Sequence, residues 1–101
     1  MKCYLLYFLT FFITLNVFSQ GIELANRVKK QLNEQNYYGA LQDLNILIDL
    51  YPDNQSLYQN RGLAKLKLKD YSGAIKDLNK AIEMDSSDYT AYNNRGLTKK
   101  N

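Results

Sequence analysis

The stretch YQNRGLAKLKLKDYSGAIKDLNKAIEMDSSD, from Tyr58 to Asp88, decides the fold, because parts of it recur before and after it at one spacing. Its Asn-Arg pair at 60–61 recurs at positions 26–27 and 94–95, at equal distances before and after it. The same shift superimposes further identities: Leu32 on Leu66, Tyr37 on Tyr71, Gly39-Ala40 on Gly73-Ala74, Asp43-Leu44-Asn45 on Asp77-Leu78-Asn79, and Ile48 on Ile82. Such self-similarity at one fixed period indicates a stacked array of one supersecondary unit.

Each repeated unit is predicted to fold as two helices. Apolar or small residues recur among polar ones between residues 57 and 68, which favours a helix with one packed face, although the end of this run also alternates like a strand. The following run is a clearer amphipathic helix, since its apolar residues keep helical spacing: Ala74, Ile75, Leu78, Ala81 and Ile82. Turn and N-cap residues lie at 69–73 and again at 85–88. The unit is therefore an αα-hairpin.

Small residues mark the expected contact between the two helices of this hairpin. Gly62 and Ala74 would face each other across it and let the backbones approach closely. They belong to a set that resembles the signature of the tetratricopeptide repeat (TPR) family: Tyr58, Gly62, Tyr71, Ala74, Leu78 and Ala81. Tyr58 stands where Trp is common, and Ser86 where Pro is common. The resemblance covers roughly residues 21–101 and implies an all-α fold, a right-handed superhelical array of about two and a half αα-hairpin repeats.

Residues 1–19 have the composition of a signal peptide. One basic residue, Lys2, precedes the apolar run CYLLYFLTFFITLNVF, which is shorter than the about 20 apolar residues wanted to span a bilayer. Val17 and Ser19 supply a small-x-small pattern, so cleavage after Ser19 is expected, which leaves residues 20–101 as the TPR domain. The protein would then be exported to the periplasm, the envelope or the medium, as in bacterial TPR proteins of this kind. The alternative is an uncleaved N-terminal anchor or a buried helix.

The TPR domain divides into two full units and a half unit. Residues 21–54 form a degenerate first repeat, because Leu24 and Val28 replace the Tyr and Gly of the second repeat and should loosen its packing. Residues 55–88 form the fullest repeat, and residues 89–101 supply a first helix only. This half repeat is either a cap or the front of a longer TPR array whose specific role lies in the missing part. Its open edge is also a candidate surface for self-association.

Composition excludes several classes of function. Residues 20–101 contain no His and no Cys, so Cys-His or Ser-His catalytic pairs and soft-metal sites are not expected, and we predict no catalytic residue, cofactor or metal. Without Lys2 the chain has 12 basic residues, that is 13 minus one, against 10 acidic residues. This small excess implies no nucleic-acid partner, and membrane contact only through an uncleaved signal segment.

Carboxylates recur at matching positions in the two full repeats. Asp43 and Asp77 could be imagined as a catalytic acid and base, but the arginines at 27, 61 and 95 lie on neighbouring helices. Ion pairs between helices are the better interpretation. We expect Arg61 to pack its stem between hairpins and to reach Asp43 or Asp77.

Recognition of a protein or peptide is the function that remains. In TPR proteins the first helices line a concave groove, and the resemblance places these residues there: Ala25, Asn26, Lys29, Leu32, Asn33, Gln59, Asn60, Leu63, Leu66, Lys67, Asn93, Asn94 and Leu97. The asparagines at 26, 60 and 94 would hydrogen-bond a ligand backbone, or else solvate an open face or bond between helices.

A known TPR ligand mode fits this chain poorly. Chaperone-binding TPR domains hold a C-terminal carboxylate with a clamp of cations and asparagines, and only Asn60 matches that clamp. Ala25 and Asn94 stand where cations or their neighbours are needed, and Lys29 replaces an Asn. The sequence therefore predicts a non-enzymatic interaction module, a scaffold or adaptor, without a carboxylate clamp.

Overall fold

The computed structural model of the chain is built from five helices joined by short loops. It describes residues 2–85 and 89–100, with side chains from 6 to 85 and from 93 to 98. The helices are α1 (Lys2–Asn33), α2 (Tyr37–Leu50), α3 (Gln55–Lys67), α4 (Tyr71–Met84) and α5 (Tyr89–Lys100). Regular structure in these described ranges is entirely helical, so the prediction of an all-α fold is confirmed, and the strand-like alternation near Leu66 has no structural counterpart.

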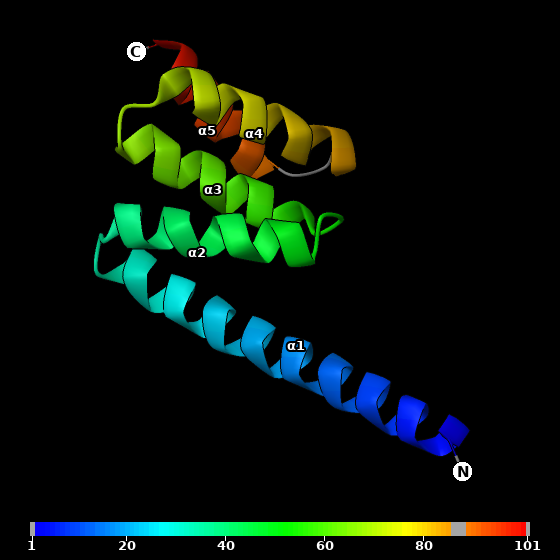
Figure 1. Cartoon of the computed structure of the whole chain (residues 1–101). Helices are drawn as coiled ribbons and strands as arrows, with labels where there is room; N and C mark the ends of the chain where they lie inside the picture. The colour runs from blue at the N-terminus through cyan, green and yellow to red at the C-terminus, as the bar shows by residue number, and fades with distance from the viewer. Residues whose placement is uncertain (1, 86–88, 101) are drawn as a thin grey trace.

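The helices form a stack of antiparallel hairpins (Figure 1). The first hairpin is α1 with α2 and the second is α3 with α4, while α5 packs on α4. Because α3 contacts both α2 and α4, the two hairpins lie directly side by side. The molecule is elongated, with extents of 63 × 28 × 19 Å, since the N-terminal half of α1 projects beyond the stack. The predicted arrangement of two hairpins and one further first helix is confirmed.

The two turns inside the hairpins have the same backbone geometry. Gln35 and Lys69, which occupy equivalent positions in successive repeats, both have positive φ, 61° and 68°. The next residue in each turn donates its N–H to a carbonyl five residues back, Asn36 to Gln31 and Asp70 to Lys65, both at 2.8 Å. This pattern is the Schellman motif, which ends a helix by satisfying its last carbonyls. Asn36 and Asp70 then accept the N–H of Gly39 and of Gly73, both at 3.1 Å, and so cap α2 and α4.

The core runs through the stack along the facing sides of the helices. Its larger cluster joins α1, α2 and the start of α3 through Leu24, Val28, Ala40, Leu44, Leu47, Ile48 and Leu57. The α3–α4 contact is tighter. A Cβ placed on Gly62 would lie 2.8 Å from Leu78 Cγ and 3.3 Å from the Ala74 carbonyl oxygen. The expected close approach at Gly62 is therefore confirmed.

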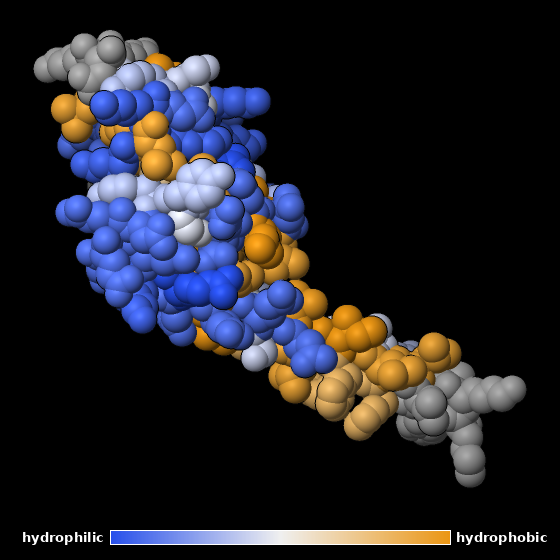
Figure 2. Space-filling model, turned by 60° about the vertical axis from the view of Figure 1, so that its left-hand side comes forward, coloured by the Kyte–Doolittle hydropathy of each residue, from blue (hydrophilic) through white to orange (hydrophobic). Residues whose placement is uncertain are grey.

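The N-terminal segment of α1 projects from the stack and is exposed. Every described residue from Leu6 to Gln20 is exposed, and this part of α1 is covered with hydrophobic side chains (Figure 2). By length and composition the helix from Leu6 to Asn33 would suffice to cross a membrane, a test that signal sequences also pass. The helix continues without a break through Ser19 and Gln20. The backbone thus marks no boundary at residue 19, and cleavage there remains a prediction.

Candidate functional site

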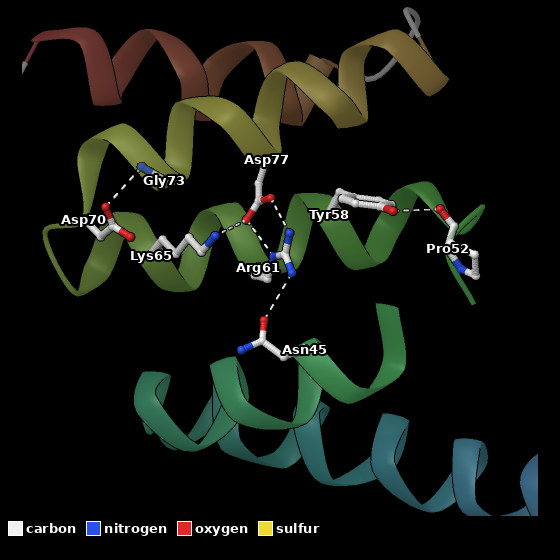
Figure 3. Close-up of polar contacts among 8 residues, drawn as sticks. All are labelled: Asn45, Pro52, Tyr58, Arg61, Lys65, Asp70, Gly73 and Asp77. Atoms are coloured by element: carbon white, nitrogen blue, oxygen red, sulfur yellow. Dashed lines mark hydrogen bonds and ion pairs between the residues drawn. The ribbon is translucent and has the colours of Figure 1, made fainter. Parts of the chain in front are cut away.

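Arg61 joins the two hairpins and so sets the spacing of the first helices. Its Nε and Nη2 donate to the two carboxylate oxygens of Asp77 at 2.8 and 2.7 Å, and its Nη1 donates to Asn45 Oδ1 at 3.1 Å (Figure 3). The Nζ of Lys65 lies 2.9 Å from the same carboxylate, which is buried. The hydrogen bonds to Asp77 raise the pKa of Arg61 above its ordinary value, although burial opposes them. The charged guanidinium and the buried carboxylate thus stabilise each other.

The same arrangement recurs along the chain. Arg27 donates to both oxygens of Asp43 at 2.6 and 2.7 Å, which raises the pKa of Arg27, and Arg95 donates to Asn79 at 3.1 Å. Arg61 makes both bonds, to the aspartate 16 residues ahead and to the asparagine 16 residues behind; Arg27 makes the first kind and Arg95 the second. Of the two partners expected for Arg61, the structure selects Asp77. These contacts tie each first helix to the second helices beside it.

Tyr58 fixes the loop between the hairpins. Its hydroxyl donates to the carbonyl of Pro52 at 2.8 Å, and the guanidinium of Arg61 lies over its ring, 5.8 Å from the centroid (Figure 3). Tyrosine provides both a hydroxyl and a π-face, so it anchors the loop and supports the arginine at once.

A hollow between α1 and α3 gathers several of the predicted binding residues. Its volume is about 340 Å³, and its lining is Ala25, Val28, Lys29, Leu32, Asn33 and Asn60. This lining combines aliphatic side chains with one ammonium group and two side-chain amides. Such a site can hold an apolar side chain and, beside it, hydrogen-bond or pair with a polar or anionic group.

A second, more apolar hollow adjoins the first at Ala25. It has a volume of about 240 Å³ and is lined by Phe18, Gly21, Ile22, Ala25, Leu47, Tyr51, Asn54 and Leu57. The two hollows together form what we call the α1–α3 groove, apolar near the N-terminal end of the TPR region and more polar further along α1. Phe18 precedes the predicted cleavage site, so removal of residues 1–19 would take one wall from the apolar end.

The other predicted groove residues are distributed along the first helices. Gln59 and Leu63 on α3 are half-buried, with Gln59 accepting the amide of Gln55 at 3.5 Å, and Lys67 is exposed. On α5, Asn93 and Leu97 are exposed and Asn94 is half-buried. Asn26 is exposed on α1 but does not line either hollow. Of the predicted set, the structure brings five members together around one hollow: Ala25, Lys29, Leu32, Asn33 and Asn60. The ligand role of all members of the set remains a prediction.

Sequence reasoning missed two kinds of residue. Val28 lines the hollow, although the sequence predicted only that it would loosen the packing of the first repeat. Its helical spacing from Ala25 and Leu32, three and four residues away, could have indicated that it lies on the same face. Asn45 and Asn79 make the bonds between hairpins that the sequence suggested for the asparagines at 26, 60 and 94. The signal was their recurrence in the repeated Asp-Leu-Asn triplet.

No group of three His, Cys, Asp or Glu side chains that could hold a metal ion occurs among the described residues. None of the curated proteins compared with the chain matches its sequence significantly. A profile of the family described as tetratricopeptide repeat matches residues 31–97. The chain belongs to the tetratricopeptide repeat family. The resemblance of the two repeats to the TPR signature is thereby confirmed.

Solved TPR domains share the architecture of the chain. The second TPR of Spaghetti (RPAP3), bound to the HSP90 peptide SRMEEVD, is 31% identical with a TM-score of 0.75 over 80% of this chain and 75% of that one. The second TPR domain of human RPAP3, in complex with the HSP70 peptide SGPTIEEVD, is 30% identical with a TM-score of 0.74, over 82% and 69%. The TPR2B domain of yeast Sti1, in a pHsp70 complex, is 27% identical with a TM-score of 0.75. That match covers 80% of this chain and 65% of the Sti1 chain, so this chain spans slightly under two thirds of the length of that relative.

Proposed function

We propose that the chain is a non-enzymatic interaction module, a scaffold or adaptor, that holds an extended acidic segment of a protein partner in the α1–α3 groove. The observation that carries this proposal is that Lys29, Asn33 and Asn60 line one hollow together with aliphatic side chains of α1. TPR domains of the same fold bind peptides, and the two RPAP3 ligands named above contain paired glutamates.

The charge distribution of the helices supports an acidic ligand. The first-helix segments 21–33, 55–67 and 89–100 contain nine of the 13 Lys and Arg residues and one acidic residue, Glu23. The second helices α2 and α4 contain four acidic residues and two lysines. Arg27, Arg61 and Lys65 are paired with buried aspartates, whereas Lys29 lines the groove. The groove side is thus the basic side of the molecule.

The mode of binding would differ from the carboxylate clamp. In the structure Ala25, Lys29 and Asn60 surround the same hollow, so the cation stands one helical turn beyond the position that the clamp uses. We propose that Lys29 pairs with an acidic side chain within the ligand, that Asn60 bonds its backbone, and that an adjacent apolar side chain contacts the aliphatic lining near Ala25 and Leu32.

Fluorescence anisotropy with designed peptides tests this function. A labelled peptide in which a leucine is followed by two glutamates should bind the full chain in mild detergent, and a version with two glutamines should bind more weakly. Raising the salt concentration should weaken only the acidic peptide, because salt screens the exposed ion pair. The Lys29→Gln variant should lose about 1 kcal/mol, or roughly fivefold in affinity, since exposed pairs contribute little more.

Lys30→Gln is the matched control for this test. Lys30 is an exposed neighbour on α1 that does not line the hollow, and its replacement changes the net charge by the same amount. An equal loss of affinity in the two variants would mean that Lys29 acts only through the net charge of the chain and not through a contact in the hollow. Binding of the glutamine peptide as tightly as the acidic one would refute the proposed recognition of an anion.

We also propose that residues 1–19 direct export and are removed. Support comes from the exposed apolar helix that precedes the stack, and from the small residues Val17 and Ser19 before Gln20. Expression in a bacterial host, followed by cell fractionation and mass determination of the N-terminus, tests this directly. A mature chain that begins at Gln20 is expected; an intact N-terminus in the membrane fraction would show the alternative, an uncleaved anchor.

A longer TPR array remains the second candidate. The observation that favours it is that 89–99 closely repeats 55–65, including Tyr, Asn, Arg, Gly, Leu and Lys at the same positions. The specific role would then lie partly in repeats not present in this sequence. Further copies of the repeated unit encoded directly after Asn101 would establish it.

A further inference from the structure

Processing at the proposed site would make Gln20 the first residue of the chain, and the structure places this residue at the edge of the packed region. Gln20 is exposed, whereas Gly21, the next residue, is buried. A Cβ on Gly21 would lie 2.9 Å from Cε2 and 3.0 Å from Cζ of Tyr51. Leu24, about one turn further along α1, is 5% exposed in the core. The new terminus would therefore begin directly before the first residue that the fold holds in place.

The backbone nitrogen of Gln20 changes its bonding when residues 1–19 are removed. In the intact chain Gln20 lies within the continuous helix α1. In the processed chain it would be the first helical residue, and the N–H groups of the first helical turn have no partner within the helix. Its nitrogen would then be an amine beside an exposed side chain. Terminal α-amino groups titrate near neutral pH, so a fraction of the chains carries the unprotonated, nucleophilic amine.

We propose that Gln20 of the processed chain is a modification site, at which the α-amine closes on its own side chain to form pyroglutamate. This inference rests on the proposed removal of residues 1–19. The nitrogen lone pair attacks Cδ of the side-chain amide, and the new N–Cδ bond completes a lactam ring of N, Cα, Cβ, Cγ and Cδ. The Cδ–Nε2 bond breaks, and Nε2 leaves as ammonia with the proton that the amine gives up. The step therefore needs no oxidant, reductant or other co-reactant.

The modification removes a positive charge from a place where the fold disfavours it. A cation at the N-terminus of a helix is opposed by the helix dipole. Gly21 and Ile22, which follow Gln20, line the apolar hollow of the α1–α3 groove. A lactam is uncharged, so the apolar end of the groove would stay without a terminal ammonium group. Lys29 would then remain the cation of the groove lining, as recognition of an acidic ligand at one end requires.

Mass measurement of the exported product tests the proposal. The full chain is expressed in a bacterial host, and its exported product is incubated at neutral pH beside a synthetic peptide of residues 20–26, which reports cyclisation at an unrestrained terminus. Both should reach a mass lower by one ammonia than that of the free amine, at similar rates, and both should then resist Edman degradation. Gln20→Asn is the matched control, because its shorter side chain would close only a strained ring one atom smaller. It keeps Val17 and Ser19, so it should be processed alike but lose no ammonia from its terminus.

The outcomes separate this modification from the processing on which it rests. A product that still contains residues 1–19, or that begins at a residue other than Gln20, would refute the proposed processing and the modification together. A product that begins at Gln20 but keeps its amine while the peptide cyclises would overturn the modification alone, because the fold would then hold the amine away from the side chain. An equal loss of ammonia in Gln20→Asn would also overturn it, since the ammonia would come from another amide of the chain.

Discussion

At the scale of single residues, the Arg61 contacts offer the most direct test of what holds the hairpins together. The side chain of Asp77 is 4% exposed and that of Arg61 is 20% exposed. Arg61→Ala leaves a buried carboxylate with Lys65 as its remaining partner and removes the bond to Asn45. We expect a loss of about 2 to 4 kcal/mol in the free energy of unfolding, measured by urea titration with circular dichroism.

Two variants serve as controls for that loss. Arg61→Lys keeps the charge but not the fork that binds both oxygens of Asp77, so it should recover only part of the stability. Arg27→Ala should cost less than Arg61→Ala, because the Arg27 side chain is 52% exposed. Equal costs at positions 27 and 61 would contradict the role given to burial.

A pair of glycine substitutions separates close packing from helix propensity. Gly62→Ala should destabilise the fold by about 1 to 3 kcal/mol, since its methyl group would press on Leu78 and the Ala74 carbonyl. Gly96→Ala should be neutral or stabilising by up to about 1 kcal/mol, because the position is open. Thermal unfolding of the two variants measures the difference. A stabilising Gly62→Ala would show that α3 and α4 can separate without cost.

The residue-scale features differ in how well the sequence predicts them. The pairing of Arg61 with an aspartate follows from the repeat, because the repeat places charges of opposite sign on neighbouring helices. The choice of Asp77 over Asp43 does not follow, since it depends on the angle between hairpins. Asn45 was missed because an amide on a polar helix face is usually solvated, and only the assembled stack brings it to Arg61.

At the scale of elements, α1 is one helix in two environments. Residues 21–33 pack on α2, whereas residues 6–20 are exposed and largely apolar. The hydroxyls of Thr10 and Thr14 bond to the backbone carbonyls of Leu6 and Thr10, so these polar groups are partnered within the helix. We therefore expect this segment to insert into the apolar interior of a lipid bilayer.

Vesicle sedimentation tests that inference. The full chain should pellet with phospholipid vesicles, while residues 20–101 should stay in the supernatant. Phe12→Lys in the full chain should weaken the association, because a lysine at the centre of an inserted helix costs about 3 kcal/mol. Pelleting of residues 20–101 to the same extent would move the membrane contact to the repeats.

The turns show where element boundaries escape sequence reasoning. A helix that ends in a Schellman motif commonly has glycine at the left-handed position, and here Gln35 and Lys69 take it. The turn that the sequence predicts at 69–73 is also too long at its C-terminal end, because α4 begins at Tyr71 and its N-cap is Asp70. The equivalent positions of Gln35 and Lys69 in the two repeats show that the repeat keeps the geometry without the usual residue.

At the scale of the whole molecule, the periodicity alone was sufficient to predict the stack of hairpins, because each unit must bury its apolar side against the next. The groove is a consequence of that stacking. The hollow itself was not predictable, since its depth depends on how far Val28 and Leu32 stand from Asn60. Five helices with a core of mostly small and medium side chains should be only marginally stable, at a few kcal/mol.

Marginal stability makes ligand binding visible in the melting temperature. A ligand that binds only the folded chain adds about 2.7 kcal/mol when its concentration is 100 times its dissociation constant. For a domain of this size each kcal/mol raises the melting temperature by about 4 to 8 °C, so the acidic peptide should raise it by roughly 10 to 20 °C. Lys29→Gln should require several times more peptide for the same rise, whereas Lys30→Gln should not. A saturating peptide that leaves the melting temperature unchanged would mean that it binds the unfolded chain as well as the groove.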